Sequence, residues 1–572
     1  DGSITRNTYN EANLLNQVDV KVGFDPPNSD FRTVVQNIDY DAKGQRTAIE
    51  YGNGTKTTYQ YDEKTYRLTN LKTIRTTNNQ VEKLQDLHYF YDPEGNITTI
   101  QDDAQDTLYF NNQVVDAVAH YVYDAVYQLA QATGRELIKG NKSARTAQDL
   151  PIVTQQSGHG AVRRYRQRFA YDAAGNIQQM RHMANGGSWT RNYTYEAISN
   201  RLVRIERGNE TLPFDHDYHG NMTKIPGVGS PVWNYDDHIQ QIGLGGGGTV
   251  YYHYDPEKNR VRKVIQNGEG LRKERLYLGN VELYRVIQGN TVTLERRTLH
   301  VADGSSRILI FERTTIENGQ PTSATKPLKT RYQYGNHLGS AALELDEEAQ
   351  IISYEEYHPY GTSAYRYGRF ATEVQAKRYR YSGKERDAET GLDYYGARYY
   401  ASWLGRWVSC DPIGVRDGLN VYLFVENSPT LKVDKDGKQS GLNTDVEHII
   451  NKGQIKKYRF PAGFEKKLVD YLTRTSGYYL RDLQAAYQIG IREWNKKAIE
   501  ENKERKKIGK PSFNLLSTNR PLPYKSVRQV YSVLVKGMIK SGVHPSMWAY
   551  IITINERENF GRAAHPVQNS FN

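Results

Sequence analysis

The chain has 572 residues, a formal net charge of +11 and a single cysteine, Cys410, which excludes an internal disulfide framework. No apolar run reaches the roughly 20 residues that a bilayer-crossing helix needs, so we expect no membrane-spanning segment. Tyrosine and glycine are abundant, with 45 Tyr and 48 Gly against 14 Phe, which favours strands and tight turns over one large aliphatic core.

A Tyr-Asp-x-x-Gly-Asn unit recurs through the first part of the chain, most clearly from Tyr91 and from Tyr171. Because Asp bonds turn backbone and Gly or Asn tolerates positive φ, each unit predicts a strand ending in Tyr, a turn and a returning strand. A single hairpin cannot bury its faces, so we expect the copies to stack into a continuous sheet. Degenerate copies begin at Tyr40, Tyr61, Tyr123, Tyr195, Tyr218 and Tyr254.

The spacing of these units is irregular, with successive starts 21 to 48 residues apart. This irregularity argues against the fixed blades of a β-propeller, which is the alternative architecture for aromatic and glycine repeats. The glycine run Gly243–Thr249 lacks the Lys-Ser/Thr of a phosphate-binding loop and predicts a flexible hairpin loop. We therefore expect residues 1–372 to be mostly β-strand, wound around a cavity.

Residues 378–437 carry the densest motif in the chain, in which Tyr, Gly and Arg precede two acidic turns. Asp411 opens an Asp-Pro-Ile-Gly turn, and Asp434 opens an Asp-Lys-Asp-Gly turn. Acid–base hydrolysis of a peptide bond needs at least two carboxyl groups that the fold brings close together. The alternative is that both aspartates only cap their turns. Nearby Arg406 and Trp407 are expected to pack or pair, and Cys410 to be a buried thiol rather than a nucleophile.

This segment resembles the RHS-repeat-associated core of bacterial Rhs toxins and of the C components of insecticidal Tc (ABC) toxin complexes. The upstream units resemble RHS/YD repeats, and Asp215–Met222 and Tyr334–Ser340 are similar to Tc and RHS signatures. The resemblance implies a mainly β fold, an RHS/YD-repeat β-hairpin cocoon that forms a hollow shell over residues 1–372. It also implies a core at 373–438, a hypervariable toxin domain at 439–572 and a further N-terminal shell region.

In the resembling family the core is an aspartyl autoprotease that cuts its own chain once. The resemblance assigns the catalytic roles to Arg398, Asp411 and Asp434. One carboxylate would hold and deprotonate a water, the other would donate a proton, and Arg398 would orient a carboxylate or stabilise the oxyanion. The cut would fall between Lys438 and Gln439. We expect neither a cofactor nor a metal for this step.

The second acidic turn departs from the family pattern, which is often Asp-Pro-x-Gly-Leu. Lys435 and Lys438 stand where that pattern has Pro and Leu. An apolar subsite for residue 438 is therefore in doubt, and Asp436 is an alternative to Asp434 as the second carboxylate.

The tail, residues 439–572, is strongly basic, with 23 Lys and Arg against 11 Asp and Glu, whereas the rest of the chain is close to neutral. This shift in charge is a domain-boundary signal. Helical patterns such as 463–473 and a strand-like run at 548–555 predict a small α+β domain. The charge alone also suits a cationic passenger that leaves through an electrostatically selective channel.

Two activities are open for this effector domain. The first is ADP-ribosyltransfer, with NAD as substrate, because the tail has the order Arg, Ser/Thr, Glu-x-Glu and resembling toxins include such enzymes. The second is a nuclease, because a basic face with histidine suits nucleic-acid cleavage. We place the transferase first. The candidate residues are Arg459, Ser517, Glu556 and Glu558 for the transferase and His448 for the nuclease.

The resemblance also implies partners and a location. A Tc-type chain would assemble with a B-type shell subunit and an A-type translocation pore, whereas an Rhs-type chain would use a type VI secretion delivery protein. The protein would be secreted, and its effector would reach the target-cell cytoplasm to act on a host protein or nucleic acid. The rival class is a non-enzymatic RHS/YD-repeat adhesion protein such as the teneurin shells, which the single cysteine and the Asp-Pro-Ile-Gly turn disfavour.

Overall fold

The computed structural model describes residues 2–442, apart from 27–28, 111–112, 139–152, 155–160, 198, 304–305, 324–325, 371–376 and 415–417. These residues belong to the first of two units into which the chain divides, Asp1–Ile449 and Ile450–Asn572. Apart from residues 439–442, the expected α+β tail lies outside the described residues. The expected boundary between shell and core, near residue 372, falls among residues 371–376, which the structure does not describe. The division between shell and core therefore stays a prediction.

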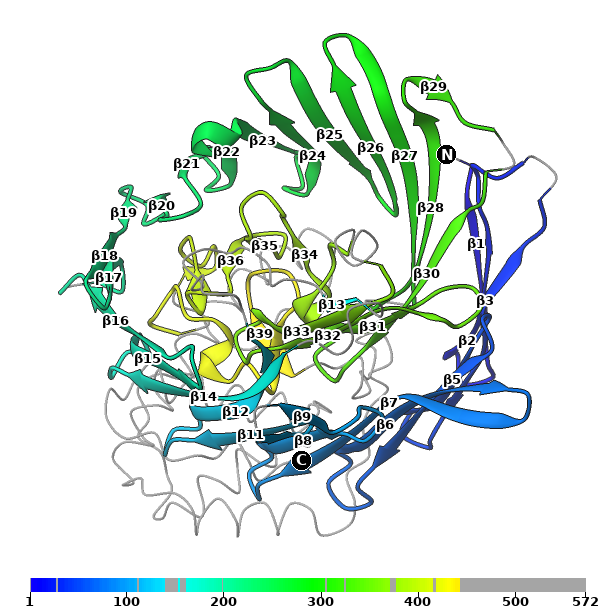
Figure 1. Ribbon diagram of the computed structural model, residues 1–572, viewed down its shortest axis with the longest axis horizontal. Helices are drawn as coiled ribbons and strands as arrows, with labels where there is room; N and C mark the ends of the chain where they lie inside the picture. The colour runs from blue at the N-terminus through cyan, green and yellow to red at the C-terminus, as the bar shows by residue number, and fades with distance from the viewer. Residues whose placement is uncertain are drawn as a thin grey trace, which may run out of the picture. The chain divides into compact units, whose positions relative to one another are not determined.

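The first of two long antiparallel sheets follows the chain almost strand by strand (Figure 1). Neighbours in sequence are neighbours in the sheet, as expected for stacked hairpins. In order, its strands are β1 (Ile4–Tyr9), β2 (Leu15–Lys21), β3 (Arg32–Tyr40), β4 (Arg46–Tyr51), β5 (Thr55–Tyr61), β6 (Leu68–Thr77), β7 (Gln80–Tyr91), β8 (Ile97–Asp102), β11 (Val118–Tyr123), β12 (Leu129–Leu137), β14 (Val162–Tyr171), β15 (Ile177–Ala184), β16 (Trp189–Tyr195), β17 (Leu202–Arg207) and β18 (Glu210–Pro213).

The second long sheet continues the same pattern, with one parallel pairing, between β13 and β33, at its end. Its strands are β13 (Val153–Thr154), β21 (Ser230–Trp233), β22 (Ile239–Gly243), β23 (Thr249–Tyr254), β24 (Arg260–Gln266), β25 (Leu271–Leu278), β26 (Val281–Gln288), β27 (Thr291–Ala302), β28 (Arg307–Glu317), β29 (Gln320–Pro321), β30 (Lys329–Gly335), β31 (Ala341–Leu345), β32 (Ile351–Tyr357) and β33 (Ser363–Gly368). Two short hairpins stand apart, β9 (Leu108–Phe110) with β10 (Gln113–Val115), and β19 (Asp215–His216) with β20 (Met222–Lys224).

The tyrosine that ends each repeat strand ties that strand to its neighbour, which explains the excess of tyrosine. Tyr91, the last residue of β7, donates its hydroxyl to the carbonyl of Leu68, the first residue of β6, at 2.7 Å. Tyr171 of β14 donates in the same way to Leu129 of β12 at 2.6 Å. The same bond joins Tyr40, Tyr61, Tyr123, Tyr195 and Tyr254 to Leu15, Arg46, Ile97, Ile177 and Ile239.

The predicted turn chemistry is also confirmed. The Asp92 carboxylate accepts the backbone N–H groups of Gly95 and Asn96, both at 2.8 Å, and the Asn96 side chain donates back to it at 2.8 Å. Gly95 has a φ of 101°, which favours glycine. Each unit therefore carries its own turn and its own tie to the preceding strand.

The unit placed at Tyr218 was predicted in the wrong register. Its turn is organised by Asp217, whose carboxylate accepts the Asn221 N–H at 2.9 Å, so His216 occupies the tyrosine position. A register shift falls at His216, as it does at the tyrosines of the other units. The Tyr218 side chain is 100% exposed because it lies in the turn and not at a strand end.

The predicted hairpin loop at Gly243–Thr249 is confirmed. Strands β22 and β23 pair antiparallel, and a short 3-10 turn at Gly245–Gly247 connects them. Another two 3-10 turns lie in the core segment, at Tyr381–Gly383 and Val425–Asn427.

The core segment folds onto both long sheets. It contains β34 (Glu385–Arg386), β35 (Asp393–Tyr394), β36 (Tyr399–Ala401) and β37 (Arg406–Trp407), which form one small sheet. It also contains β38 (Lys432–Asp434), which forms a hairpin with β39 (Ser440–Leu442), just beyond the expected end of the core at residue 438. Its aromatic residues share one hydrophobic cluster with residues of β12, β14–β17, β22 and β23. Figure 1 shows this segment in yellow, beside the strands of both sheets.

Stacked rings and buried ion pairs hold the core segment in place. Tyr400 stacks on Phe424 with ring centroids 3.8 Å apart, and Trp407 packs edge-on against Phe424 at 5.4 Å. The Asp387 carboxylate forms ion pairs with Arg260 at 2.9 Å and with Lys263 at 2.7 Å. Both cations belong to β24, so these ion pairs connect the core segment to that strand. Within the described part of the chain, no helix has the length and apolar character needed to span a membrane.

Candidate active site

The structure brings Arg398, Asp411 and Asp434 together. Arg398 directly precedes β36, Asp411 lies in the turn after β37, and Asp434 ends β38. The Nη2 atom of Arg398 lies 2.9 Å from Oδ2 of Asp411 and 3.3 Å from Oδ2 of Asp434. All three side chains are buried. One guanidinium nitrogen therefore joins two carboxylates that are separated in sequence.

Arg398 is held by contacts on two further sides. Its guanidinium carbon lies 4.1 Å from the centroid of the Trp407 ring, and its Nε donates to the carbonyl of Gly437 at 2.6 Å. A guanidinium stays charged at any accessible pH. Arg398 is thus a fixed positive charge aimed at both aspartates and at the second acidic turn.

The second acidic turn wraps around the carboxylate of Asp434. Oδ1 of Asp434 accepts the backbone N–H groups of Asp436 at 3.2 Å, Gly437 at 2.7 Å and Lys438 at 3.2 Å. Strands β38 and β39 pair on either side, with Asp434 opposite Ser440. The Lys438–Gln439 bond therefore lies in a tight hairpin turn directly beside a buried carboxyl group.

Burial raises the pKa of Asp434 above its usual value. The Arg398 guanidinium and the amide donors of Gly437 and Asp436 oppose this rise in pKa, and the charge of Asp436 adds to it. Asp411 has a different environment, in which Oδ1 accepts the backbone N–H of Ile413 at 2.9 Å. The two carboxyl groups are therefore not equivalent.

Glycine is required at position 437. Its φ is 77°, and a Cβ atom would lie 2.9 Å from the backbone nitrogen of Arg398. We expect Gly437→Ala to cost about 1–3 kcal/mol of stability, measured by denaturant unfolding, because the turn must move away from Arg398. Gly279→Ala is the control, because it has a φ of 64° but nothing within 4 Å of its Cβ. Equal losses for the two variants would contradict the contact with Arg398.

Lys438, one of the two lysines that depart from the family pattern, fits this turn. The Lys438 side chain is 50% exposed, and its Nζ lies 3.6 Å from the carboxylate of Asp436, which is 58% exposed. Residue 438 therefore has a solvated side chain and needs no apolar subsite. Asp436 faces solvent and Lys438, so the geometry favours Asp434 as the second carboxylate.

The residues beside the site have packing roles. Arg406 donates to the carbonyl of Asn200 at 2.6 Å and lies between the rings of Tyr195 and Tyr422. The Cys410 thiol donates to the Tyr422 hydroxyl at 3.2 Å, and burial raises its pKa. A raised pKa keeps this sulfur protonated, which agrees with a structural thiol.

The comparisons with known proteins agree with this architecture. No family model matches the chain. Toxin subunit YenC1 of Yersinia entomophaga is 36% identical over 482 residues, covering 79% of this chain and 47% of the relative. YenC2 of the same organism is 35% identical, covering 71% of this chain and 43% of its own length. A solved TcdB2–TccC3 complex superposes with a TM-score of 0.68 at 34% identity, covering 76% of this chain and 21% of that one. This chain belongs to the RHS-repeat C components of Tc toxin complexes.

The Tc C component described here spans about half the length of the curated relatives that it matches. A Photorhabdus luminescens Tc holotoxin pore, with an aspartate-to-alanine substitution in TccC3, also superposes, with a TM-score of 0.68 at 34% identity over 77% of this chain and 20% of that one. The predicted mainly β, RHS-type shell fold is thereby confirmed. An enclosed cavity and the catalytic roles of the site residues stay predictions.

Sequence reasoning missed Lys384 as a member of this C component's site. Its Nζ donates to the carbonyl of Lys435 at 2.5 Å, and burial lowers its pKa to about 8. Lys384 and Asp434 both line a cavity of about 210 Å³. The local sequence gives no signal for this role, because Lys384 reaches the site only through the fold of the core segment. The effector candidates His448, Arg459, Ser517, Glu556 and Glu558 lie outside the described residues.

Proposed function

We propose that this Tc C component is an aspartyl autoprotease that cuts its own chain once, between Lys438 and Gln439. The observation that carries the proposal is the pair of contacts from one Arg398 nitrogen to Asp411 and Asp434, at 2.9 and 3.3 Å. The proposed scissile bond lies in the turn that Asp434 organises. The test is mass determination of the purified chain together with its active-site variants.

The two carboxyl groups have different roles in the proposed reaction. Asp434, whose pKa burial raises, holds the proton and donates it to the scissile amide as the bond breaks. Asp411 takes a proton from the attacking water and is kept in place by Arg398. Because the bond and the catalytic groups belong to one chain, no substrate-binding step is needed and the reaction occurs once.

The hairpin also bears on release of the effector. After the cut, β39 would start at Ser440, one residue beyond the new N-terminus, and would still pair with β38 through Lys432–Leu442, Val433–Gly441 and Asp434–Ser440. Three residue pairs are a weak tie, because a strand this short gains little on its own. The hairpin alone would therefore hold the cut effector at the site only weakly.

The rate of cutting should depend on pH. Asp434 must be protonated, and its pKa is raised above the roughly 3.9 of a free aspartate, so cutting should slow as pH rises through that raised pKa. The folded chain also binds this proton more tightly than the unfolded chain, so the contribution of Asp434 to stability is lost over the same rise in pH. Refolding the denatured, uncut chain at a series of pH values and following the uncut band would measure this. A rate that increases steadily with pH would contradict the assignment of Asp434 as the acid.

We further propose that the protein is secreted, assembles with a B-type shell subunit and an A-type pore, and delivers residues 439–572 to the target-cell cytoplasm. The solved relatives support this, because TccC3 is found with TcdB2 in one structure and within a holotoxin pore in another. Co-purification with a B-type subunit tests the assembly. A non-enzymatic adhesion shell, the rival class, would show neither the cut nor this assembly.

Two activities remain proposed for the released effector, and single substitutions separate them. If the tail is an ADP-ribosyltransferase using NAD, Glu558→Gln should abolish its toxicity while His448→Ala does not. If it is a nuclease that uses the histidine, the effects are reversed. Relatives that include the tRNA nuclease WapA of Bacillus subtilis, 26% identical over 47% of this chain, support the second option. A purified tail that neither labels protein from NAD nor degrades RNA or DNA would contradict both.

A further inference from the structure

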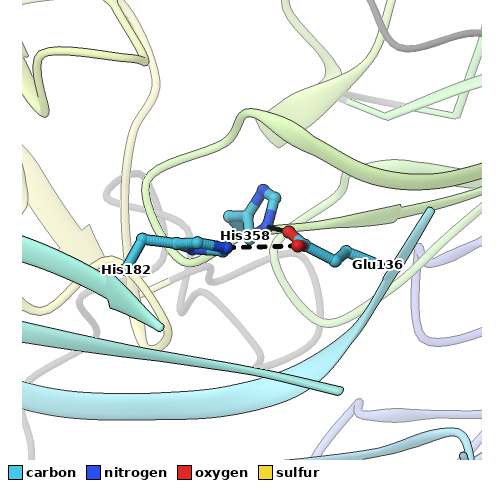
Figure 2. Close-up of side chains that lie close together, drawn as sticks. All are labelled: Glu136, His182 and His358. Atoms are coloured by element: carbon cyan, nitrogen blue, oxygen red, sulfur yellow. Dashed lines mark hydrogen bonds and ion pairs between the residues drawn. The ribbon is translucent and has the colours of Figure 1, made fainter. Parts of the chain in front are cut away.

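Away from the aspartates, two histidines and one glutamate converge where the two long sheets meet. Glu136 belongs to β12, His182 to β15, and His358 follows β32 of the other sheet directly. His182 Nε2 lies 3.1 Å from Oε1 of Glu136, and His358 Nε2 lies 3.1 Å from Oε2 (Figure 2). The three ligand atoms all lie within 4.8 Å of one another.

We propose that Glu136, His182 and His358 form a binding site for a divalent transition-metal ion, with Zn²⁺ as the ion of best fit. Two imidazoles and one carboxylate form a common donor set for Zn²⁺, with metal–ligand bonds of about 2.0–2.1 Å. Neighbouring ligands of a tetrahedral site with such bonds lie about 3.3 Å apart. The two separations of 3.1 Å are close to that spacing, so the ion could enter with small shifts of the side chains.

The surroundings hold the ligands in the orientation that a metal needs. The ring of His182 lies between Trp189 and Tyr165, stacked at 5.1 Å and 5.7 Å. The second ring nitrogen of His358 bonds the Thr362 hydroxyl at 3.0 Å. Outer hydrogen bonds of this kind orient the ring and fix which nitrogen faces the ion.

Hydrogen bonds also hold the Glu136 carboxylate in a fixed position. Arg163 donates to Oε1 at 2.8 Å through Nε, whereas Oε2 is bonded by His358 at 3.1 Å, so an ion would take the place of that second bond. His358, but neither Glu136 nor His182, also lines a cavity of about 120 Å³, from which a water could approach the ion.

A metal here would act as a structural clamp. The three ligands come from both long sheets, and His358 is followed by Pro359, whose carbonyl accepts the hydroxyl of Tyr381 in the core segment. A bound ion would therefore fix the first sheet to the turn on which the core segment rests. This role is independent of the proposed autoproteolysis, since the site shares no residue with the aspartate pair.

Zinc titration of the full, chelator-stripped chain tests the proposal, by calorimetry and by metal content after dialysis. We expect one Zn²⁺ per chain that is lost in the double variant His182→Gln/His358→Gln, and affinity about tenfold weaker in Thr362→Val. The matched control is His300→Gln, because His300 bonds buried Glu282 at 2.8 Å beside Arg275, and among the described residues no second histidine joins them in a group that could hold a metal. This variant should keep its zinc.

Two results would overturn the proposal. One is a wild-type chain that binds no zinc, which would leave the cluster as a hydrogen-bonded ion network. The other is equal binding by the wild type and the double variant, which would place the zinc elsewhere. If the double variant fails to fold, Co²⁺ added to the stripped wild-type chain replaces that comparison. The visible bands of a tetrahedral nitrogen and oxygen site, bleached by Zn²⁺, are expected, and their absence counts against the site.

Discussion

Asp411→Asn and Asp434→Asn should each leave the chain uncut. Each substitution keeps the size of the side chain but removes one half of the acid–base pair. A positioned acid or base typically contributes about 10²–10⁴-fold to the rate. The uncut fraction, read from a denaturing gel at fixed times after refolding, should therefore stay near its starting value.

Asp436→Asn is the matched control for these two variants. Asp436 lies in the same turn, two residues from Asp434, but its side chain is 58% exposed and faces Lys438. This variant should be cut at close to the normal rate. Normal cutting in both Asp411→Asn and Asp434→Asn would exclude the aspartyl mechanism, whatever Asp436→Asn does.

Arg398→Ala should both stop the cutting and destabilise the fold. Removing one partner of a buried ion pair typically costs about 3–5 kcal/mol, because the remaining charge is left buried without compensation. Here two buried carboxyl groups lose their shared guanidinium, and Trp407 loses the cation above its ring. The uncut fraction and the free energy of unfolding from denaturant titration measure the two effects.

Arg406→Ala separates the loss of chemistry from the loss of packing. Arg406 is buried and stacks on aromatic rings as Arg398 does, but it contacts the Asn200 carbonyl and the rings of Tyr195 and Tyr422. This variant should be less stable and still cut. An Arg398→Ala chain that folds and cuts normally would show that Arg398 has only a structural role.

Local chemistry explains which features the sequence could predict. The Asp92 turn and the strand-ending Tyr91 are set by residues within one hairpin, so their spacing alone predicts them. The Tyr218 unit failed because His216, two residues earlier, takes the tyrosine position and Asp217 organises the turn.

Contacts between residues far apart in the chain could not be predicted from sequence spacing. Arg398, Asp411 and Asp434 were assigned only through the family resemblance, since the aromatic packing of the core segment brings them together. Glu136 and His358 are 222 residues apart, and their meeting depends on how two sheets pack. No spacing within the chain signals such a meeting.

The mass of the purified wild-type chain, with sequencing of any new N-terminus, tests the central claim most directly. The account predicts two fragments held together under native conditions and separated by denaturant, with the second starting at Gln439. A single uncut chain of 65.6 kDa from a correctly folded sample would contradict autoproteolysis. A new N-terminus far from the Asp434 turn would contradict the site assigned here.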